Sequence, residues 1–298
     1  MTIGYVGLGS MGGALARRLQ LTHSLMVHDM SVASVQDLVA KGATAAVSPG
    51  DVAARCEVIF LCLPTSDHVR AVIFGDNGIA ASAKPGLLIV DQTSGDPNAT
   101  RAMAKQLASR GIGLIDAPVS GGPQGAEAGT IAIMVGATPD QFARIAPILR
   151  AISPNIFHAG GTGNGHVIKL VNNLISGAQR LLTLEGLALA VKNGVDTATA
   201  VEILRAGGAK NAYLQRGDRI VQGDLSTPFT LGLMHKDVRL ACQLGIESDV
   251  PLLFGNLTRE LYQMCINENG REAKVDTSAL VIERTAGTHI VPRTYRVD

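Results

Sequence analysis

Tryptophan is absent from this chain of 298 residues, and aromatic residues make up only 3% of it. This scarcity argues against aromatic platforms on which nucleic-acid bases stack. Neither sign of charge dominates, because 26 basic residues are balanced by 25 acidic ones and the net charge is +1. That balance gives no electrostatic reason to bind nucleic acid or an anionic membrane. We therefore expect no nucleic-acid partner and no membrane partner.

Cysteines are few, and long apolar runs are missing. The four cysteines have no CxxC or zinc-ligand spacing and mostly lie in apolar segments, so we expect reduced core thiols; they are Cys56, Cys62, Cys242 and Cys265. The scattered histidines form no ligand pair, and no metal is expected. No apolar run approaches the roughly twenty residues that cross a bilayer, and no basic leader precedes the first apolar run. These absences favour a cytoplasmic protein.

The first half of the chain alternates short β-branched runs with helical segments, which is typical of a mostly parallel, doubly wound α/β sheet. Strands are expected at residues 3–6, 25–28, 58–63, 87–91, 114–116 and 131–135. The hydrophobic fraction of 46% excludes a largely disordered protein. The length exceeds the usual size of one core, so two domains are expected.

A glycine-rich break at residues 159–165 separates this half from a different pattern. The run from 166 to about 193 is apolar almost all round, as in a helix buried on most faces. Further helices and no strand are expected beyond it, at 197–206, 212–221, 233–244, 251–267 and 277–284. We therefore predict a Rossmann domain over 1–162. An all-helical substrate and dimerisation domain over 163–298 would open with a long interdomain helix and form a homodimer or homotetramer.

The motif Gly7-Leu8-Gly9-Ser10-Met11-Gly12 follows an apolar strand and opens a helical pattern. Gly7 permits a sharp turn, Gly9 lets the backbone approach a pyrophosphate, and Gly12 lets the helix pack closely. Amides at the helix start are then free to bind phosphate. The context of the motif predicts a dinucleotide site.

Asp29 follows the second strand, about twenty residues after the motif, where a carboxylate binds the ribose hydroxyls of NAD and repels the 2'-phosphate of NADP. Met30 and Ser31 supply no arginine for that phosphate. NAD is therefore the expected cofactor. Alternatively, Asp29 caps the helix that begins near Ser31.

Two further segments carry residues suited to chemistry. Lys169 and Asn173 lie four apart and project from one helix face. Apolar neighbours would lower the pKa of Lys169 and permit proton exchange near neutrality, although its stem can equally lie on the core with the ammonium in water. The segment 116–123 ends a strand with Ser120 and the pair Gly121-Gly122, whose amides can cradle a carboxylate or form an ordinary turn.

Taken together, these segments resemble the 3-hydroxyisobutyrate dehydrogenase family of β-hydroxyacid dehydrogenases, which includes tartronate semialdehyde reductases. The resemblance covers nearly the whole chain. It rests on four motifs in the family's order, at 7–12, at 116–122 with 125–130, at 165–173 and at 235–237.

The resemblance implies that Lys169 is the general acid/base, that Asn173 orients the substrate or the lysine, and that Ser120, Gly121 and Gly122 hold the substrate carboxylate. It also implies a set of residues that line or close over the cofactor, namely Leu63, Pro64, Ser94 and Lys236. The family often has serine before threonine where this chain has Thr93-Ser94, which makes the Ser94 contact less secure.

The implied activity is NAD-dependent hydride transfer between a small 3-hydroxy acid and the nicotinamide, giving the semialdehyde. A semialdehyde reductase working in the reverse direction is the alternative, and a non-catalytic dinucleotide-binding module is a third hypothesis. Retention of both Lys169 and Asn173 favours the enzyme. His166 has a weaker claim to a role, through its closeness to Lys169.

Overall fold

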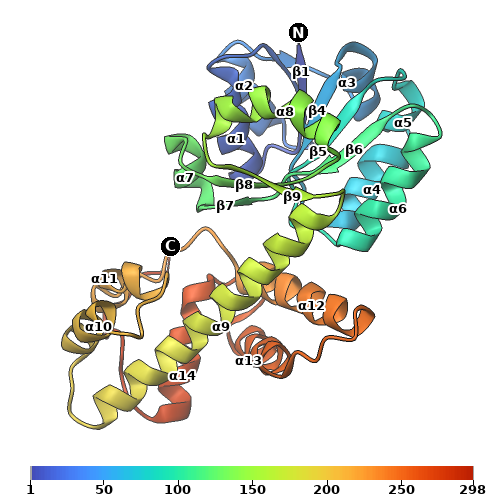
Figure 1. The fold of residues 1–298 in the computed structure, drawn as a ribbon. Helices are drawn as coiled ribbons and strands as arrows, with labels where there is room; N and C mark the ends of the chain where they lie inside the picture. The colour runs from blue at the N-terminus through green and yellow to red at the C-terminus, as the bar shows by residue number, and fades with distance from the viewer. Residues whose placement is uncertain (1, 298) are drawn as a thin grey trace. The chain divides into compact units, whose positions relative to one another are not determined.

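A computed structural model describes residues 2–297, and the chain divides into two compact units after Lys169 (Figure 1). We call residues up to 169 the α/β unit and residues from 170 the helical unit. The fold class expected from the sequence, a doubly wound domain followed by an all-helical one, is confirmed. The domain boundary expected between residues 162 and 163 stays a prediction.

One sheet forms the centre of the α/β unit. Its first six strands are parallel in the order 3-2-1-4-5-6, with β8 next to β6. They are β1 (Ile3–Val6), β2 (Leu25–His28), β3 (Thr44–Ala45), β4 (Val58–Leu61), β5 (Leu88–Asp91) and β6 (Gly113–Asp116). β8 (Ala132–Gly136) is antiparallel to β6 and to β7 (Val119–Ser120), and parallel to β9 (Ile156–Gly160).

Helices cover both faces of this sheet because successive strand residues point to opposite sides. Tyr5 and Phe60 belong to one apolar core, with α1 (Ser10–Gln20) and α8 (Pro139–Ile152). Ile59 and Ile89 belong to the other, with α3 (Pro49–Arg55), α4 (Ser66–Phe74) and α6 (Pro97–Ala108). The remaining helices of the unit are α2 (Val32–Val39), α5 (Ile79–Ser82) and α7 (Gly122–Ala128).

The helical unit contains the helices expected from periodicity, with one difference. They are α9 (Asn164–Lys192, beginning in the α/β unit), α10 (Thr197–Ala206), α12 (Leu231–Glu247), α13 (Leu253–Asn269) and α14 (Ser278–Ala286), the last preceded by a 3-10 turn at Val275–Thr277. The single helix expected over 212–221 is instead a 3-10 turn (Leu214–Arg216) and the short α11 (Asp218–Val221). Gly217 lies between them, and a Cβ there would come within 2.5 Å of Val201 on α10.

One expectation about α9 is wrong, namely that the helix is buried on most faces. Four apolar residues seven apart along it, Ile168, Ile175, Leu182 and Leu189, are between 47% and 70% exposed, so the helix is not buried on most faces. The helix also contains an 18-residue window of mean hydropathy 1.3, which is long and apolar enough to cross a membrane. Interspersed polar residues hid this window from a search for continuous apolar runs. The criterion is weak evidence, because core helices of soluble proteins also meet it.

Candidate functional site

The glycine loop between β1 and α1 has the geometry that each glycine was expected to supply. Gly7 has a φ of +93°, in a region that favours glycine. A Cβ on Gly12 would lie 2.0 Å from the carbonyl oxygen of Gly7, so α1 can pack this closely only without a side chain there. A Cβ on Gly9 would meet nothing within 4 Å. The loop is therefore tight at Gly7 and Gly12 and open at Gly9.

The open position faces a helix start that suits an anion. Gly9 is the N-cap of α1 and makes no side-chain hydrogen bond to the first turn, which contains no acidic residue. The amides of Ser10 and Met11 therefore make no hydrogen bond to a capping side chain. At other helix starts of this unit a capping side chain accepts such a bond, as Thr65 does at α4. Space at Gly9 and uncapped amides fit the pyrophosphate of a dinucleotide.

The predicted cofactor residues of the α/β unit lie together at the carboxyl ends of the parallel strands. Val6, Leu61 and Asp91 are aligned across β1, β4 and β5, so the residues after them emerge side by side. Leu63 and Pro64 follow β4, and the amide of Leu63 donates to Thr93 Oγ1 at 3.1 Å. Ser94 follows β5. The strand order reverses between β1 and β4, which is where ligands of open α/β sheets bind.

Asp29 lies just beyond β2 and forms a hydrogen bond with the glycine loop. Its Oδ2 accepts a hydrogen bond from the amide of Leu8 at 2.6 Å, and its Oδ1 accepts one from the amide of Ser31 at 2.7 Å. Ser31, not Asp29, is the N-cap of α2. Each carboxylate oxygen keeps a second lone pair. Asp29 is therefore placed to hold the loop and still accept from a ribose hydroxyl.

The predicted substrate turn follows β7. Ser120 is the last residue of that strand, Gly121 has a φ of +142° and Gly122 a φ of +73°. A Cβ on Gly121 would lie 3.2 Å from a side-chain carbon of Ile131, so the turn is narrow as well as left-handed. An ordinary tight turn shares these angles, and the carboxylate-binding role stays a prediction.

Lys169 and Asn173 are both buried on α9, with 9% and 6% of their surfaces exposed. Lys169 is the last residue of the α/β unit, and Asn173 belongs to the helical unit. The side-chain amide of Asn173 donates to Asp237 Oδ2 at 2.5 Å. Lys236 Nζ lies 3.0 Å from the other oxygen of Asp237. The structure thus brings Asn173 and Lys236 to one carboxylate within the helical unit.

Asp237 is a residue that sequence reasoning missed. It is 1% exposed and sits on α12, 64 residues from the asparagine it accepts from. Its position next to Lys236 in the motif 235–237 was the available signal. The fact that it joins two predicted site residues becomes visible only when α9 and α12 are packed together.

A second missed cluster surrounds the start of α9, entirely within the α/β unit. Asp116 accepts hydrogen bonds from the amides of Gly163 at 2.5 Å and His166 at 2.7 Å. The His166 ring is fully buried; its Nδ1 is 3.1 Å from Thr100 Oγ1, and its Nε2 is 3.9 Å from Asp91 Oδ2. Burial raises the pKa of Asp91. His166 is therefore one of the residues that hold the helix start, and its role beside Lys169 stays a prediction.

Sequence comparison agrees with this arrangement over both units. Residues 2–161 match the NAD binding domain of 6-phosphogluconate dehydrogenase, and residues 163–282 match the family described as NAD-binding of NADP-dependent 3-hydroxyisobutyrate dehydrogenase. The 2-(hydroxymethyl)glutarate dehydrogenase of Eubacterium barkeri is 40% identical over 265 residues, 88% of each chain. This chain belongs to the 3-hydroxyisobutyrate dehydrogenase family. It is an NAD(P)-dependent oxidoreductase.

Other members of the family are similar along almost their whole length. The 3-hydroxyisobutyrate dehydrogenase of Pseudomonas aeruginosa is 36% identical over 289 residues, which is 93% of this chain and 96% of the relative. The solved structure of the Mycobacterium tuberculosis 3-hydroxyisobutyrate dehydrogenase with L-serine is 25% identical. It has a TM-score of 0.85 and covers 94% of this chain and 98% of that one.

Proposed function

We propose that this chain transfers a hydride between a small 3-hydroxy acid and NAD, giving the semialdehyde, with Lys169 as the general acid/base. The observation that carries the proposal is a dinucleotide-fitting glycine loop in the same unit as a buried lysine, on a helix that also carries a buried asparagine four residues on. Relatives named for hydroxy-acid substrates support the substrate class.

Lys169 performs the proton transfer in this proposal. In the oxidising direction its neutral amine accepts the proton of the substrate hydroxyl, and in the reducing direction its ammonium donates that proton to the aldehyde oxygen. When bound, the nicotinamide accepts or returns the hydride. The physiological direction can therefore be that of a semialdehyde reductase with no change in the residues used.

Asn173 supplies orientation rather than a proton. Its Nδ2 is held by Asp237 and its Oδ1 accepts from the side chain of Asn172 at 2.9 Å, so the amide plane is restrained from both ends. Such a restrained amide presents a fixed dipole to the substrate or to the lysine. Ser120, Gly121 and Gly122 are proposed to hold the substrate carboxylate, because both glycines lie in a turn with positive φ angles and successive backbone amides in a turn can bind an anion.

NAD is proposed as the cofactor in preference to NADP. The carboxylate of Asp29 stands where the 2'-substituent of the adenosine ribose is expected, and a 2'-phosphate would be repelled there. Leu63, Pro64 and Ser94 are proposed to line the site, and the role of Lys236 toward the cofactor stays a prediction. The ratio of kcat/KM for NAD to that for NADP tests this, and Asp29→Asn is expected to lower the ratio about tenfold.

The deciding experiment follows reduced nicotinamide by absorbance, with purified protein, NAD and a panel of 3-hydroxy acids. Lys169→Ala is expected to lower kcat about a thousandfold, as loss of a general base does. Lys192→Ala is the matched control, because this lysine is also on α9 and donates to the carbonyl of Gly287. Turnover that survives Lys169→Ala contradicts the mechanism, and tight NAD binding without turnover of any acid or semialdehyde contradicts the activity.

A cytoplasmic homodimer or homotetramer is proposed for the assembled enzyme. The exposed stripe Ile168, Ile175, Leu182 and Leu189 runs along α9 at seven-residue intervals, the repeat with which helices pack against one another. A second copy of the chain, covering this stripe, would remove it from water. Light scattering at micromolar concentration tests this: Leu182→Glu is expected to shift the protein toward monomer, and a monomeric unmodified protein contradicts the proposal.

A further inference from the structure

We propose that Asp116 is a positioning residue for catalysis, which fixes the first turn of α9 and through it the location of Lys169. The inference rests on the proposed role of Lys169. Asp116 is the last residue of β6 and is completely buried. Its two carboxylate oxygens accept from the amides of Gly163 and His166, at 2.5 and 2.7 Å. A carboxylate from a distant strand therefore takes the place of a local helix cap.

The surroundings are shaped to admit this carboxylate. Gly136 pairs with Asp116 across β6 and β8, and a Cβ on Gly136 would lie 2.4 Å from Asp116 Oδ1. A Cβ on Gly165 would lie 2.8 Å from Asp116 Oδ2 and 2.3 Å from the carbonyl oxygen of Met134. Both sheet and helix thus lack a side chain where the carboxylate sits. The close approach of α9 to the strand end depends on that space.

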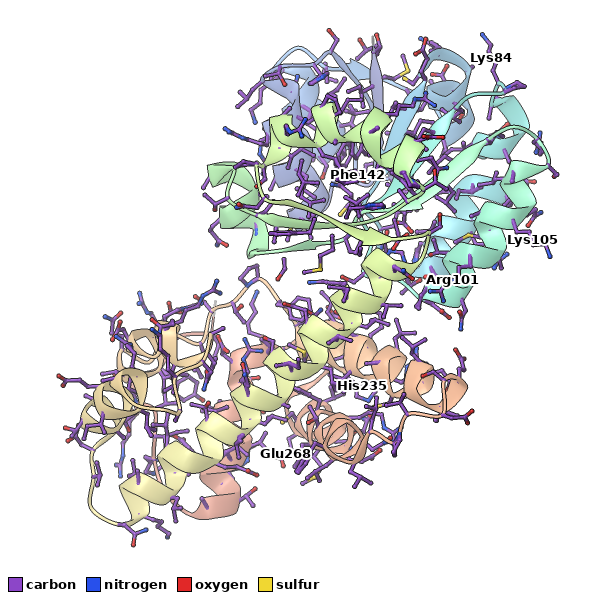
Figure 2. All side chains as sticks on the ribbon, in the orientation of Figure 1. Lys84, Arg101, Lys105, Phe142, His235 and Glu268 are labelled. Atoms are coloured by element: carbon purple, nitrogen blue, oxygen red, sulfur yellow. The ribbon has the colours of Figure 1, made fainter. Side chains whose placement is uncertain are left out.

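Other contacts hold the same turn to a different element. His166 bonds through Nδ1 to Thr100 on α6. Arg101, the next residue of α6, is labelled in Figure 2. It donates to the side chain of Asn164 at 3.1 Å and to the carbonyl of Thr162 at 3.3 Å. The start of α9 is therefore tied to β6 and α6, two elements of the unit that carries the glycine loop.

Lys169 lies three residues beyond His166, less than one turn from these ties. The helical backbone transmits a tilt of the first turn directly to the lysine. A reacting group misplaced by about 1 Å can cost about a hundredfold in rate. Asp116 thus acts on the reaction through the backbone of α9, without touching the reacting atoms.

Asp116→Asn tests the proposal, because it keeps the shape but replaces one acceptor oxygen with an NH2 group that faces an amide. We expect kcat to fall at least tenfold at a temperature where the variant is fully folded, while KM and the Kd for NAD change less than about twofold. Gly136→Ala, which crowds the carboxylate without altering its charge, is expected to lower kcat in the same way. Asp196→Asn is the control, because Asp196 caps α10 through the amide of Thr199 and should leave kcat unchanged.

Two results overturn the inference. If Asp116→Asn lowers Tm and leaves kcat unchanged, Asp116 has a structural role only. If the variant raises KM and leaves kcat unchanged, Asp116 acts on substrate binding. In the Lys169→Ala background, Asp116→Asn should have no further effect on the residual rate, and multiplicative losses would also overturn it. Failure of the proposed function is distinguishable, since it appears as full activity of Lys169→Ala or as no turnover by the unmodified protein, and neither result is a change caused by Asp116→Asn.

Discussion

The two units carry candidate site residues of different kinds. In the α/β unit the candidate cofactor site is mainly backbone, with a glycine loop, uncapped amides and turns that follow neighbouring strands. In the helical unit the candidate site is a buried side-chain network of Asn173, Asp237 and Lys236. The first kind of site is sensitive to added volume, and the second is sensitive to the loss of a charge. Matched substitutions in the two units separate these sensitivities.

Of the substitutions that test this difference between the units, the largest effect is expected from volume added to the glycine loop. Gly12→Ala places a Cβ 2.0 Å from the carbonyl of Gly7, so the loop or the helix must shift. Overpacking of this kind costs up to about 3 kcal/mol, and we expect roughly a hundredfold weaker NAD binding by calorimetry. Gly186→Ala on α9 is the control, because a Cβ there meets nothing within 4 Å. Equal NAD affinities for the two variants would contradict the expectation that added volume in the glycine loop of the α/β unit weakens NAD binding.

Loss of charge in the helical unit is expected to act on turnover. Asp237→Asn removes the carboxylate shared by Asn173 and Lys236, and a hydrogen bond to a charged group is worth about 1.5–3 kcal/mol. We expect kcat/KM to fall about tenfold to a hundredfold in the absorbance assay. Asp218→Asn breaks an exposed pair with Arg205 in the same unit and should change kcat/KM less than about twofold. An unaffected Asp237→Asn enzyme would show that the network is not part of the site.

The smallest effects are expected in the pH dependence of stability, and they have opposite signs in the two units. Burial raises the pKa of Asp91, so the folded protein loses stability as Asp91 ionises with rising pH. Asp91→Asn should therefore raise Tm at pH 7, by about 2–4 °C for each kcal/mol. This gain should shrink as the pH falls toward 4.

Asp224 gives the opposite expectation in the helical unit. Hydrogen bonds from Arg219 and Ser226 hold its pKa well below the usual range, so its stabilising contribution is present at neutral pH. That contribution is lost only when the pH falls below about 4 and through the lowered pKa. Asp224→Asn should lower Tm at pH 7, with a deficit that persists down to about pH 4. Thermal unfolding of both variants from pH 7.5 to 3.5 checks the signs, and parallel curves would contradict both.

Sequence patterns predicted the parts of the fold that depend on interactions between residues close together in the chain. Every strand expected in the first half is present within a few residues. β3 and β7 were not expected, because two residues each are too short to show periodicity, and β9 was also missed, because none of its residues is buried and its sequence shows no apolar alternation. The roles of Gly7, Gly9 and Gly12 were predictable because they depend on a turn and on the helix that follows it. The faces of α9 were not, because burial depends on which neighbours cover each side.

The sequence by itself determined the class of fold, the glycine loop and the family, since these follow from residue spacing along the chain. Only the tertiary structure decided that Asp237 joins Asn173 to Lys236 and that Asp116 holds the start of α9. Those contacts span 64 and about 50 residues. A carboxylate can satisfy an amide on any element that packs against it, so its partner is set by packing and not by its neighbours in the chain.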